Sequence, residues 1–420
     1  MKKILEKILA NLAKKILTKY NPEIIGITGS VGKTSTKETV HAVLRDSFNV
    51  RTNIKNYNTE IGVPLTIIHT ESAGKNIFRW LIIIFKAWKL ILIKDKNYPQ
   101  ILILEMAADH PGDIKYLVKL APCKIGIVTA VGASHTEFFG SVKGVAQEKS
   151  NIVSHLKKSD TAILNIDDNL VYKMQKKTSA SVLTYGLSEH AQIRAFDIHY
   201  SNGDGVECKI SNSLSTVPAK FKNVLASSQI SSILAALAVA QTYNLNLKES
   251  SDSLKDFRFP AGRLQLLPGI KKTKIIDDTY NSSPKAVKVA LEVLSRIKCT
   301  GRRWAVLGDM LELGVLTEPA HKEIGEWIKS FKVDILVTVG ERTKDTAQIV
   351  ENNWLPPEKV ITFSNADEAK VFIQNEIEPD DLILIKGSQG MRMEKIVKEI
   401  MAEPNKAKIL LVRQSKKWLK

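Results

Sequence analysis

A short glycine-containing loop between an apolar run and a helical pattern restricts most strongly what this chain can fold into. The loop lies in "GITGSVGKTSTKE", Gly26 to Glu38, and follows the run "EII". A loop that joins a strand to the start of a helix directs backbone N–H groups toward an anion. The segment departs from the common pattern G-x-x-x-x-G-K-[ST], because position 27, where the first glycine would stand, is Ile. Since strand and helix patterns flank the loop, we predict a phosphate site; a glycine turn without a ligand is the alternative.

The residue types in the loop assign roles in holding a nucleotide. Gly29 and Gly32 allow the backbone to turn sharply and approach phosphate. Lys33 would reach the β and γ phosphates, and the Thr34 hydroxyl would be a ligand of Mg²⁺. The predicted nucleotide-binding residues of the loop are Gly29, Ser30, Val31, Gly32, Lys33, Thr34 and Ser35.

The order of elements along the chain predicts the α/β class. Short apolar runs alternate with helical patterns, which is typical of parallel sheets with crossover helices. At 420 residues the chain is too long for one ordinary core, so we expect two domains or more. Predicted strands of a first series lie at residues 23–28, 100–108, 123–131 and 160–167, and those of a second series at 273–278, 302–309, 333–340, 359–363 and 381–387.

A segment rich in proline and glycine, "FRFPAGRLQLLPG" at residues 257–269, separates the two series and is the predicted linker. Between residues 181 and 222 the runs indicate antiparallel additions to the first sheet, and an Ala/Ser-rich helix follows at 226–244. We therefore expect a basic amphipathic helix at 1–20, a central P-loop-type domain with a parallel sheet at 21–258, and a Rossmann-like α/β domain at 259–420.

The charge and cysteine content limit the class of partner. A formal net charge of +17 favours anionic partners, although lysine-rich solvated surfaces explain it equally well. Nucleic acid is disfavoured, because few basic clusters are interleaved with aromatic residues. Three distant cysteines without C-x-x-C spacing indicate neither a disulfide framework nor a zinc site, in keeping with a reducing cytoplasm.

Two apolar segments leave membrane contact open. In "MKKILEKILANLAKKILTKY" apolar residues recur at helical spacing among six lysines, and no cleavage site follows. Such a basic amphipathic helix either lies in a membrane interface or packs on the protein's own surface. The segment at residues 77–93 carries Arg79, Lys86 and Lys89 and is too short and charged to span a bilayer, so we predict a buried or interfacial helix. We expect a cytoplasmic protein, with peripheral contact at the inner face of the membrane through the N-terminal helix left open.

The shortened loop T-G-x-x-G-K-T, here "TGSVGKTS", resembles the ATP loop of the Mur ligases. These enzymes join a carboxylate of a peptidoglycan precursor to an amino acid or dipeptide. The resemblance extends over about residues 22–400 and is greatest to the members that add D-alanyl-D-alanine. It implies a central ATPase domain with ATP and Mg²⁺ as cofactors. Further segments follow in the family's order: "NYNTEIGVPLTI", "LEMAADHPGDI", "VGASHTEFFGSVKGVAQEKSNI", "LNIDD", "AGRLQ", "IIDDTYNSSP", "AVLGDMLELG" and "IKGSQGMRME".

The catalytic residues are expected around the loop. Glu105 closes the apolar run "ILILE", so its carboxylate would emerge at the edge where open α/β sheets bind ligands; a capping acid is the alternative. The resemblance implies that Thr34 and Glu105 lie around one Mg²⁺. It assigns His135 to a second Mg²⁺ and Lys149, as a carbamate, to support of that metal; a structural histidine and a surface lysine are the alternatives. The predicted catalytic set is Lys33, Glu105, His135 and Lys149.

The second domain is expected to hold the other end of the nucleotide. Arg263 in "AGRLQ" can bridge phosphates as a planar fork of donors. The resemblance implies that Asp278 accepts hydrogen bonds from the ribose, with Tyr280 and Asn281 on the same loop and Asp277 sharing the role. Closure of the two domains over the linker would then assemble the site.

The chain departs from the family pattern at two places. Mur ligases carry an N-terminal domain that grips UDP, whereas here the phosphate loop begins at residue 26, so we expect that domain to be missing or replaced. Before the Ala-rich helix, Ser228, Gln229 and Ser232 occupy positions where the family has adenine-binding His and Asn residues. We therefore expect different adenine contacts and an acceptor that is not held by the usual UDP-binding domain.

Three functions follow from these patterns. We favour an ATP-dependent amide ligase that activates a carboxylate as an acyl phosphate and joins UDP-N-acetylmuramoyl tripeptide to D-alanyl-D-alanine. The second is a Mur-type ligase with a non-UDP or lipid-linked carboxylate acceptor, and the third is a catalytically silent nucleotide-binding scaffold of cell-wall enzymes. The third is disfavoured because the chain retains the residues expected to act in catalysis, which are Lys33, Glu105, His135, Lys149 and Asp278. The expected partners are the peptidoglycan precursor and D-alanyl-D-alanine as small molecules, and we expect a monomer.

Overall fold

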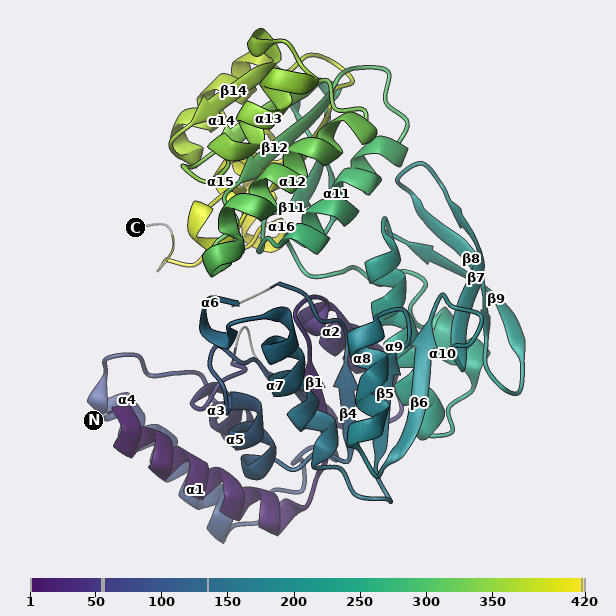
Figure 1. The fold of residues 1–420 in the computed structure, drawn as a ribbon. Helices are drawn as coiled ribbons and strands as arrows, with labels where there is room; N and C mark the ends of the chain where they lie inside the picture. The colour runs from purple at the N-terminus through teal and green to yellow at the C-terminus, as the bar shows by residue number, and fades with distance from the viewer. Residues whose placement is uncertain (1, 54–56, 134–135, 417, 419–420) are drawn as a thin grey trace.

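The computed structural model describes residues 2–53, 57–133, 136–416 and 418. Two sheets with helices on their faces lie one above the other in Figure 1, so the α/β class is confirmed. The chain passes from the first sheet to the second between the end of α10 at Asp252 and the start of β10 at Gln265. The predicted boundary at residues 258 and 259 falls within this connection and stays a prediction.

The first sheet has nine strands in the order β2-β3-β1-β4-β5-β6-β7-β8-β9. Pairing is parallel from β2 through β7 and antiparallel from β7 to β9. The strands are β1 (Glu23–Thr28), β2 (Val50–Thr52), β3 (Ile101–Glu105), β4 (Ile125–Val128), β5 (Thr161–Asn165), β6 (Ser181–Gly186), β7 (Ile193–Tyr200), β8 (Gly205–Ser211) and β9 (Thr216–Lys222).

One expectation for this sheet is wrong. We expected residues 181–222 to be antiparallel additions, but β6 pairs in parallel with β5 from Ser181 to Tyr185, and β7 still pairs in parallel with β6 at two positions. The connection through helix α8 (Asn169–Tyr172) and the 3₁₀ turn η1 (Lys173–Lys177) brings β6 back in the same direction as β5. Only the tight turns after β7 and β8 reverse the chain. The antiparallel part extends to the right in Figure 1.

Helices cover both faces of this sheet because alternate residues of each buried strand point to opposite sides. Ile24, Leu102 and Leu104 face the helices α1, α3, α5 and α7, whereas Ile25 and Ile103 face α2 and α9. The helices of this half are α1 (Lys2–Tyr20), α2 (Lys33–Leu44), α3 (Gly62–Ile68), α4 (Ile77–Leu92), α5 (Asp113–Leu120), α6 (Thr136–Phe139), α7 (Val142–Ser154), α8 (Asn169–Tyr172), α9 (Ser227–Thr242) and α10 (Leu247–Asp252), with a 3₁₀ turn η1 (Lys173–Lys177).

The helix predicted at residues 77–93 forms as α4, but it is not buried. Only Ile83 and Ala87 of this helix are buried, and they pack against α1 and α3. Most of its large apolar side chains face outward, and α1 likewise buries one face and exposes Ile4 and Ile8. Of the two expectations for residues 77–93, a buried helix is therefore wrong. No helix in the described part of the chain is long and apolar enough to cross a bilayer.

The second sheet has six strands in the order β10-β11-β15-β12-β13-β14, and only β10 runs antiparallel to its neighbour. One face packs on α11, α12 and α13 and the other on α14 and α15. The strands are β10 (Gln265–Pro268), β11 (Lys274–Asp278), β12 (Arg303–Gly308), β13 (Ile335–Val339), β14 (Val360–Phe363) and β15 (Leu382–Lys386). The helices are α11 (Pro284–Arg296), α12 (Thr317–Ser330), α13 (Lys344–Asn353), α14 (Ala366–Glu376), α15 (Glu394–Ile400) and α16 (Ala407–Leu410), with 3₁₀ turns η2 (Ile270–Lys272), η3 (Gly314–Leu316), η4 (Pro357–Lys359), η5 (Gln389–Met391) and η6 (Pro404–Lys406).

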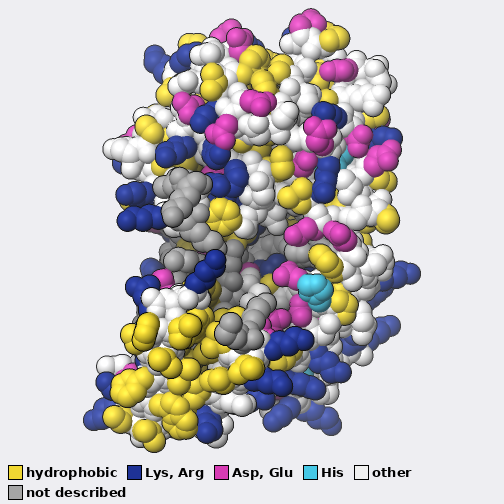
Figure 2. All heavy atoms as spheres, turned by 90° about the vertical axis from the view of Figure 1, so that its left-hand side faces the viewer, with side chains coloured by type: hydrophobic (Ala, Val, Ile, Leu, Met, Phe, Trp, Pro, Cys, Tyr) yellow, Lys and Arg dark blue, Asp and Glu magenta, His cyan; other side chains and the backbone are white. Residues whose placement is uncertain are grey.

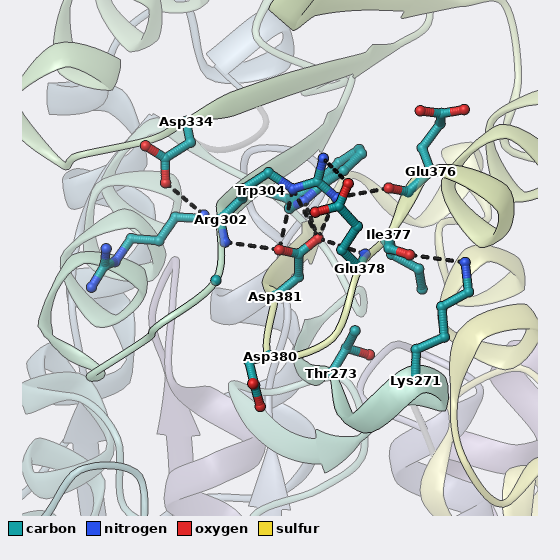
Figure 3. Close-up of polar contacts among 12 residues, drawn as sticks. Lys271, Thr273, Arg302, Trp304, Asp334, Glu376, Ile377, Glu378, Asp380 and Asp381 are labelled. Atoms are coloured by element: carbon teal, nitrogen blue, oxygen red, sulfur yellow. Dashed lines mark hydrogen bonds and ion pairs between the residues drawn. The ribbon is translucent and has the colours of Figure 1, made fainter.

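A polar network connects the amino end of β12 to the amino end of β15 in the second sheet. Asp381, only 1% exposed, accepts hydrogen bonds from the Arg302 backbone N–H at 2.8 Å and its guanidinium Nη2 at 2.8 Å. The indole Nε1 of Trp304 donates to the same carboxylate at 2.9 Å, as Figure 3 shows. Burial alone would raise the pKa of Asp381, but the hydrogen bonds from Arg302 and Glu378 outweigh it and hold the pKa below its ordinary value.

We expect Asp381→Asn to lower the free energy of unfolding by about 2–3 kcal/mol, because an amide cannot satisfy donors arranged around a carboxylate. The pKa of Asp381 is lowered on folding, so its stabilisation is present above the unfolded value of about 4 and is lost as the pH falls below it. Urea unfolding at pH 7 and at acidic pH measures both effects. Asp380→Asn, at the exposed neighbouring carboxylate, is the matched control and should leave both values unchanged.

Candidate functional site

The predicted phosphate loop lies at the carboxyl end of β1, between β3 and β4. This is the point at which chain connections leave in opposite directions, where open α/β sheets bind ligands. The Ser30 N–H donates to Ala130 O at 2.7 Å, and the Ser30 hydroxyl and Gly132 contact each other through two hydrogen bonds. The loop is therefore anchored to the segment after β4, with its backbone held in one conformation.

Glycine is required at two positions of the loop. Gly29 has φ +153°, and a Cβ there would lie 2.0 Å from Thr129 Oγ1. Gly32 has φ +88° and precedes α2 without any side-chain cap. The first N–H groups of α2 consequently have no side-chain partner at the cap, and together with the helix dipole they favour an anion.

Lys33, the first residue of α2, lies over the loop and donates from Nζ to Gly29 O at 2.8 Å. Burial lowers the pKa of Lys33, the carboxylate of Glu105 opposes that shift, and the charge of Arg263 lowers the pKa further. The charges of two predicted site residues, one from each sheet, thus act on the same amine.

Glu105 is positioned by three side chains at the end of β3. The Thr34 hydroxyl donates to Oε2 at 3.0 Å, and Asn58 Nδ2 donates to Oε1 at 3.0 Å. The backbone N–H of Glu105 donates to Asn53 Oδ1, so the strand end itself is held. The carboxylate is only 4% exposed and points toward the start of α2. Asn53 and Asn58 were not among the predicted residues, although Asn58 lies in the family segment "NYNTEIGVPLTI".

Lys149 lies on α7 and is 3% exposed. Within the described ranges its amine has no hydrogen-bond or ion-pair partner. Burial, and after it the positive charge of Lys33, lowers the pKa of Lys149 to about 7. The preceding Glu148 accepts from the N–H groups of Gly112 at 2.9 Å and Ile114 at 2.7 Å, which fixes the start of α5 beside α7. A surface lysine, the alternative considered above, is therefore wrong.

Arg263 follows the linker and stacks on Tyr280, with its guanidinium 3.8 Å from the ring centroid. Its Nε is buried without a hydrogen-bond partner among the described residues. A buried hydrogen-bond donor on a charged group costs free energy when it has no acceptor. This nitrogen therefore fits a ligand with acceptor oxygens, such as a phosphate.

Asp278 closes β11 and is held from two sides. Lys386 Nζ, at the end of the adjacent strand β15, lies 2.6 Å from Oδ2, and the Leu264 N–H donates to Oδ1 at 3.2 Å. Lys386 also donates to the backbone O of Asn281 at 2.9 Å, which shapes the loop that carries Tyr280. Burial raises the pKa of Asp278, with the charge of Lys386 opposing the shift.

Asp277 does not share this position. Adjacent strand residues point to opposite faces, and Asp277 is fully buried on the side of Ile275. Burial raises the pKa of Asp277 to about 6, although Thr279 donates to its carboxylate from both the N–H and the hydroxyl.

Arg413 supports the loop at residues 279–281 and was not among the predicted residues. It donates to the backbone O of Tyr280 at 3.1 Å and forms an ion pair with Glu394 at 2.7 Å.

The residues at the expected adenine positions have other partners here. Gln229 Nε2 donates to the backbone O of Arg263 at 3.1 Å, and its Oε1 accepts from the Leu225 N–H at 2.6 Å. Gln229 therefore ties the first turn of α9 to the linker. Ser232 donates to the Ser228 backbone O at 3.2 Å.

Electrostatic interactions indicate that several of the predicted residues lie near one another. The charge of Lys33 acts on Lys149, that of Arg263 acts on Lys33, and Arg263 also acts on Asp278. Two contacts also connect the two halves of the chain: Lys285 Nζ lies 3.0 Å from Asp168 Oδ2, and the Thr136 hydroxyl donates to Leu313 O at 3.0 Å.

Of the other predicted residues, His135 lies outside the described residues. Val31 accepts from Thr129 through its backbone O, and Ser35 is buried in α2.

The donor set at Thr34 and Glu105 fits Mg²⁺. This ion prefers oxygen ligands and is usually bound by one or two carboxylates, waters and substrate phosphates. A carboxylate and a hydroxyl lie together here, beside a helix start suited to phosphate. In the described part of the chain no three His, Cys, Asp or Glu residues cluster as a metal site. Thr34 and Glu105 are the residues that would hold the ion, together with water and phosphate oxygens.

Comparison with known proteins finds matches over most of the chain. The family described as "Mur ligase middle domain" matches residues 27–78 and 87–240, and "Mur ligase, glutamate ligase domain" matches residues 262–389. A UDP-N-acetylmuramoyl-tripeptide–D-alanyl-D-alanine ligase of Bacillus subtilis (strain 168) is 30% identical over 396 residues, which cover 94% of this chain and 79% of that protein. The corresponding ligase of Mycobacterium tuberculosis (strain H37Rv) is 28% identical, over 90% of this chain and 73% of that protein.

Solved structures show the same fold. MurF ligase from Thermotoga maritima in complex with ADP superposes with a TM-score of 0.78 at 27% identity, covering 96% of this chain and 84% of that one. A folylpolyglutamate synthase of Mycobacterium tuberculosis complexed with ADP superposes with a TM-score of 0.64 at 14% identity, covering 95% of this chain and 97% of that one. The second likeness concerns the fold alone.

Proposed function

The chain belongs to the Mur ligase family, and on that premise we propose that it joins D-alanyl-D-alanine to the terminal carboxylate of UDP-N-acetylmuramoyl tripeptide. Members of the family are ATP-dependent ligases, so the reaction class of this chain is an ATP-driven amide synthesis. The choice of substrates is the proposal, and the similarity to the Bacillus subtilis ligase supports it.

The contact between Thr34 and Glu105 carries the catalytic part of the proposal. It brings a hydroxyl and a carboxylate together at the start of a helix whose first N–H groups lack a side-chain cap. Phosphates of ATP would bind these N–H groups and Lys33, and Thr34 with Glu105 would hold Mg²⁺. Bound Mg²⁺ would neutralise phosphate charge.

In the first step an oxygen of the substrate carboxylate attacks the γ-phosphorus of ATP. A new P–O bond forms and the bond between the γ-phosphorus and the β-phosphate oxygen breaks. The products of this step are an acyl phosphate and ADP. Lys33, which lies over the loop, would offset the negative charge that develops on the β-phosphate. Arg263, which belongs to the second domain, would donate to the phosphates of ATP through its Nε.

In the second step the amine of D-alanyl-D-alanine attacks the acyl carbon. The tetrahedral species then expels phosphate as the C–O bond breaks, and the nitrogen loses a proton to give the amide. Both steps depend mainly on positioning and charge stabilisation. Bridging contacts such as that of Lys285 with Asp168 would hold the two domains together during the reaction.

We further propose that Lys149 acts as a carbamate. Its side chain is buried and has no hydrogen-bond or ion-pair partner in the described ranges, and burial lowers its pKa to about 7, so a large neutral fraction is present at neutral pH. Reaction of the neutral amine with CO₂ releases one proton and forms an N–C bond. The resulting anion would compensate the charge of Lys33 and of a nearby metal ion.

A ligase for a non-UDP or lipid-linked carboxylate is the second candidate. The match to the Bacillus subtilis relative covers 79% of that protein, so part of the relative has no matched counterpart here.

ADP release by the purified full chain tests both candidates. We expect release with UDP-N-acetylmuramoyl tripeptide plus D-alanyl-D-alanine, and background release when L-alanyl-L-alanine replaces the dipeptide. Release only with the tripeptide lacking UDP, or with a lipid-linked acceptor, would overturn the first candidate in favour of the second. If no pair of substrates stimulated release, the chain would be a nucleotide-binding scaffold and not a ligase.

A further inference from the structure

Helix α4 presents an apolar face to solvent. We define the α4 face by its exposed large apolar side chains, which lie on successive turns of the helix and continue one residue beyond it. Phe78 is 79% exposed and Phe85 is 73% exposed, far more than core residues of these types. The members of the α4 face are Ile77, Phe78, Leu81, Ile82, Phe85, Trp88, Leu92 and Ile93.

The α4 face is held in place by helix α1. Leu9, Leu12 and Ile16 of α1 are buried in the core that also contains Ile83 and Ala87 of α4. Lys19 donates from Nζ to the backbone O of Leu90 at 3.0 Å and of Ile91 at 2.8 Å, so it caps the carboxyl end of α4. The α4 face therefore belongs to a pair of helices, α1 and α4, that pack together on the first domain. The pair lies at the lower left of Figure 1, away from the second domain.

Positive charge surrounds this apolar face. Residues 72–98 contain six Lys and Arg residues and one acidic residue, Asp95, and residues 2–20 contain six lysines and one glutamate. Lys15 lies with its Nζ 4.9 Å from the ring centroid of Trp88. Figure 2 shows hydrophobic side chains gathered on the lower part of the face, with Lys and Arg at the margins.

The combination of apolar and basic side chains indicates which kind of partner covers the α4 face. An apolar stripe bordered by lysines is typical of helices that lie in the interface of an anionic membrane. A second copy of the chain is disfavoured, because pairing the faces would bring two sets of like charges together. The family match is interrupted between residues 78 and 87, so Leu81, Ile82 and Phe85 of the α4 face lie outside the matched residues.

We propose that the α1–α4 pair docks this protein on anionic phospholipid bilayers. The side chains of the α4 face enter the interface between headgroups and acyl chains, and the lysines and arginine around it contact lipid phosphates. The phosphate loop lies at the carboxyl edge of the first sheet, apart from α4, so docking leaves the ligase site accessible.

Vesicle co-sedimentation of the full chain tests this proposal. The probes are vesicles of phosphatidylcholine alone and vesicles with about one third phosphatidylglycerol. We expect binding to the anionic vesicles, weakened by high salt because the electrostatic part is screened. We expect the double variant Phe78→Ser/Phe85→Ser to bind at least about tenfold more weakly, since two inserted aromatic side chains are lost.

The matched control is Leu214→Ser/Ile409→Ser, which removes two apolar side chains that are 89% and 82% exposed elsewhere on the surface. It should bind as the wild type does, and all proteins should share one thermal unfolding midpoint. Failure of the wild type to bind anionic vesicles would overturn the proposal, as would equal binding by the Phe78/Phe85 variant. A dimer in light scattering that this variant dissociates, without vesicle binding, would also overturn it and assign the face to a second copy.

Discussion

Lys33→Ala is expected to reduce ADP release by about 1000-fold or more while leaving the fold intact. Lys33 is the amine that lies over the phosphate loop, where Nζ donates to Gly29 O, and the developing charge on the β-phosphate has to be offset there. Among the described residues the amine makes one hydrogen bond, to a backbone oxygen of its own loop. Its loss should therefore cost little stability.

The measurement is the turnover number at saturating ATP, together with the thermal unfolding midpoint. Lys115→Ala, at an exposed lysine of α5, is the matched control and should keep full activity. Isothermal titration should show weaker ATP binding by Lys33→Ala. Turnover within about tenfold of the wild type would show that the loop is not the phosphate site of the reaction.

Lys149→Ala should reduce turnover by about 100-fold or more, and short carboxylic acids such as acetate should restore part of it. The reason is that the variant lacks the amine which, as a carbamate, would supply an anion near Lys33 and the metal. A small carboxylate can enter the space left by the side chain and supply the same charge. Lys143→Ala, on the exposed side of the same helix, should be fully active and insensitive to acetate.

A second readout does not depend on activity. In the presence of ¹³C-bicarbonate we expect a carbamate resonance in the wild-type protein and its loss in Lys149→Ala. The resonance should grow as the pH rises through about 7, because the pKa of Lys149 is lowered to about 7 and only the neutral amine reacts. Absence of the resonance, with acetate failing to restore Lys149→Ala, would contradict the carbamate. Lys33→Ala should not respond to acetate, since it lacks a cation.

The local elements follow from the sequence because their signals are local. The run "EIIGIT" becomes β1 with the predicted bounds, Glu23–Thr28, and α2 begins at Lys33 directly after the glycine loop. Gly29 and Gly32 could be recognised because both have a positive φ that favours glycine, and a side chain at Gly29 would also collide with Thr129. Glu105 could be recognised because it closes a buried strand beside that loop.

The supporting residues could not be found in this way. Asn53 and Asn58 lie about 50 residues from the Glu105 that they hold, and Arg413 lies over 130 residues from the carbonyl of Tyr280. Hydrogen bonds across such separations leave no periodic pattern. Gln229, assigned from the sequence to a position where relatives bind adenine, instead holds the linker, because its amide reaches Arg263 O once α9 is packed.

The direction of β6 and the exposure of α4 were likewise decided by tertiary structure. An alternating apolar run is the same in parallel and antiparallel pairs, so only the path through α8 and η1 sets the direction of β6. An apolar helix can be a core helix or an interfacial one, and α4 is exposed because α1 covers only one side of it. By itself the sequence determined the α/β class, the phosphate loop and the chemistry available at the strand ends, since these depend on residues adjacent in the chain. Burial of Lys149, the pairing of Asp278 with Lys386 and the outward face of α4 arise only when distant segments pack together, since packing alone sets burial and hydrogen-bond partners.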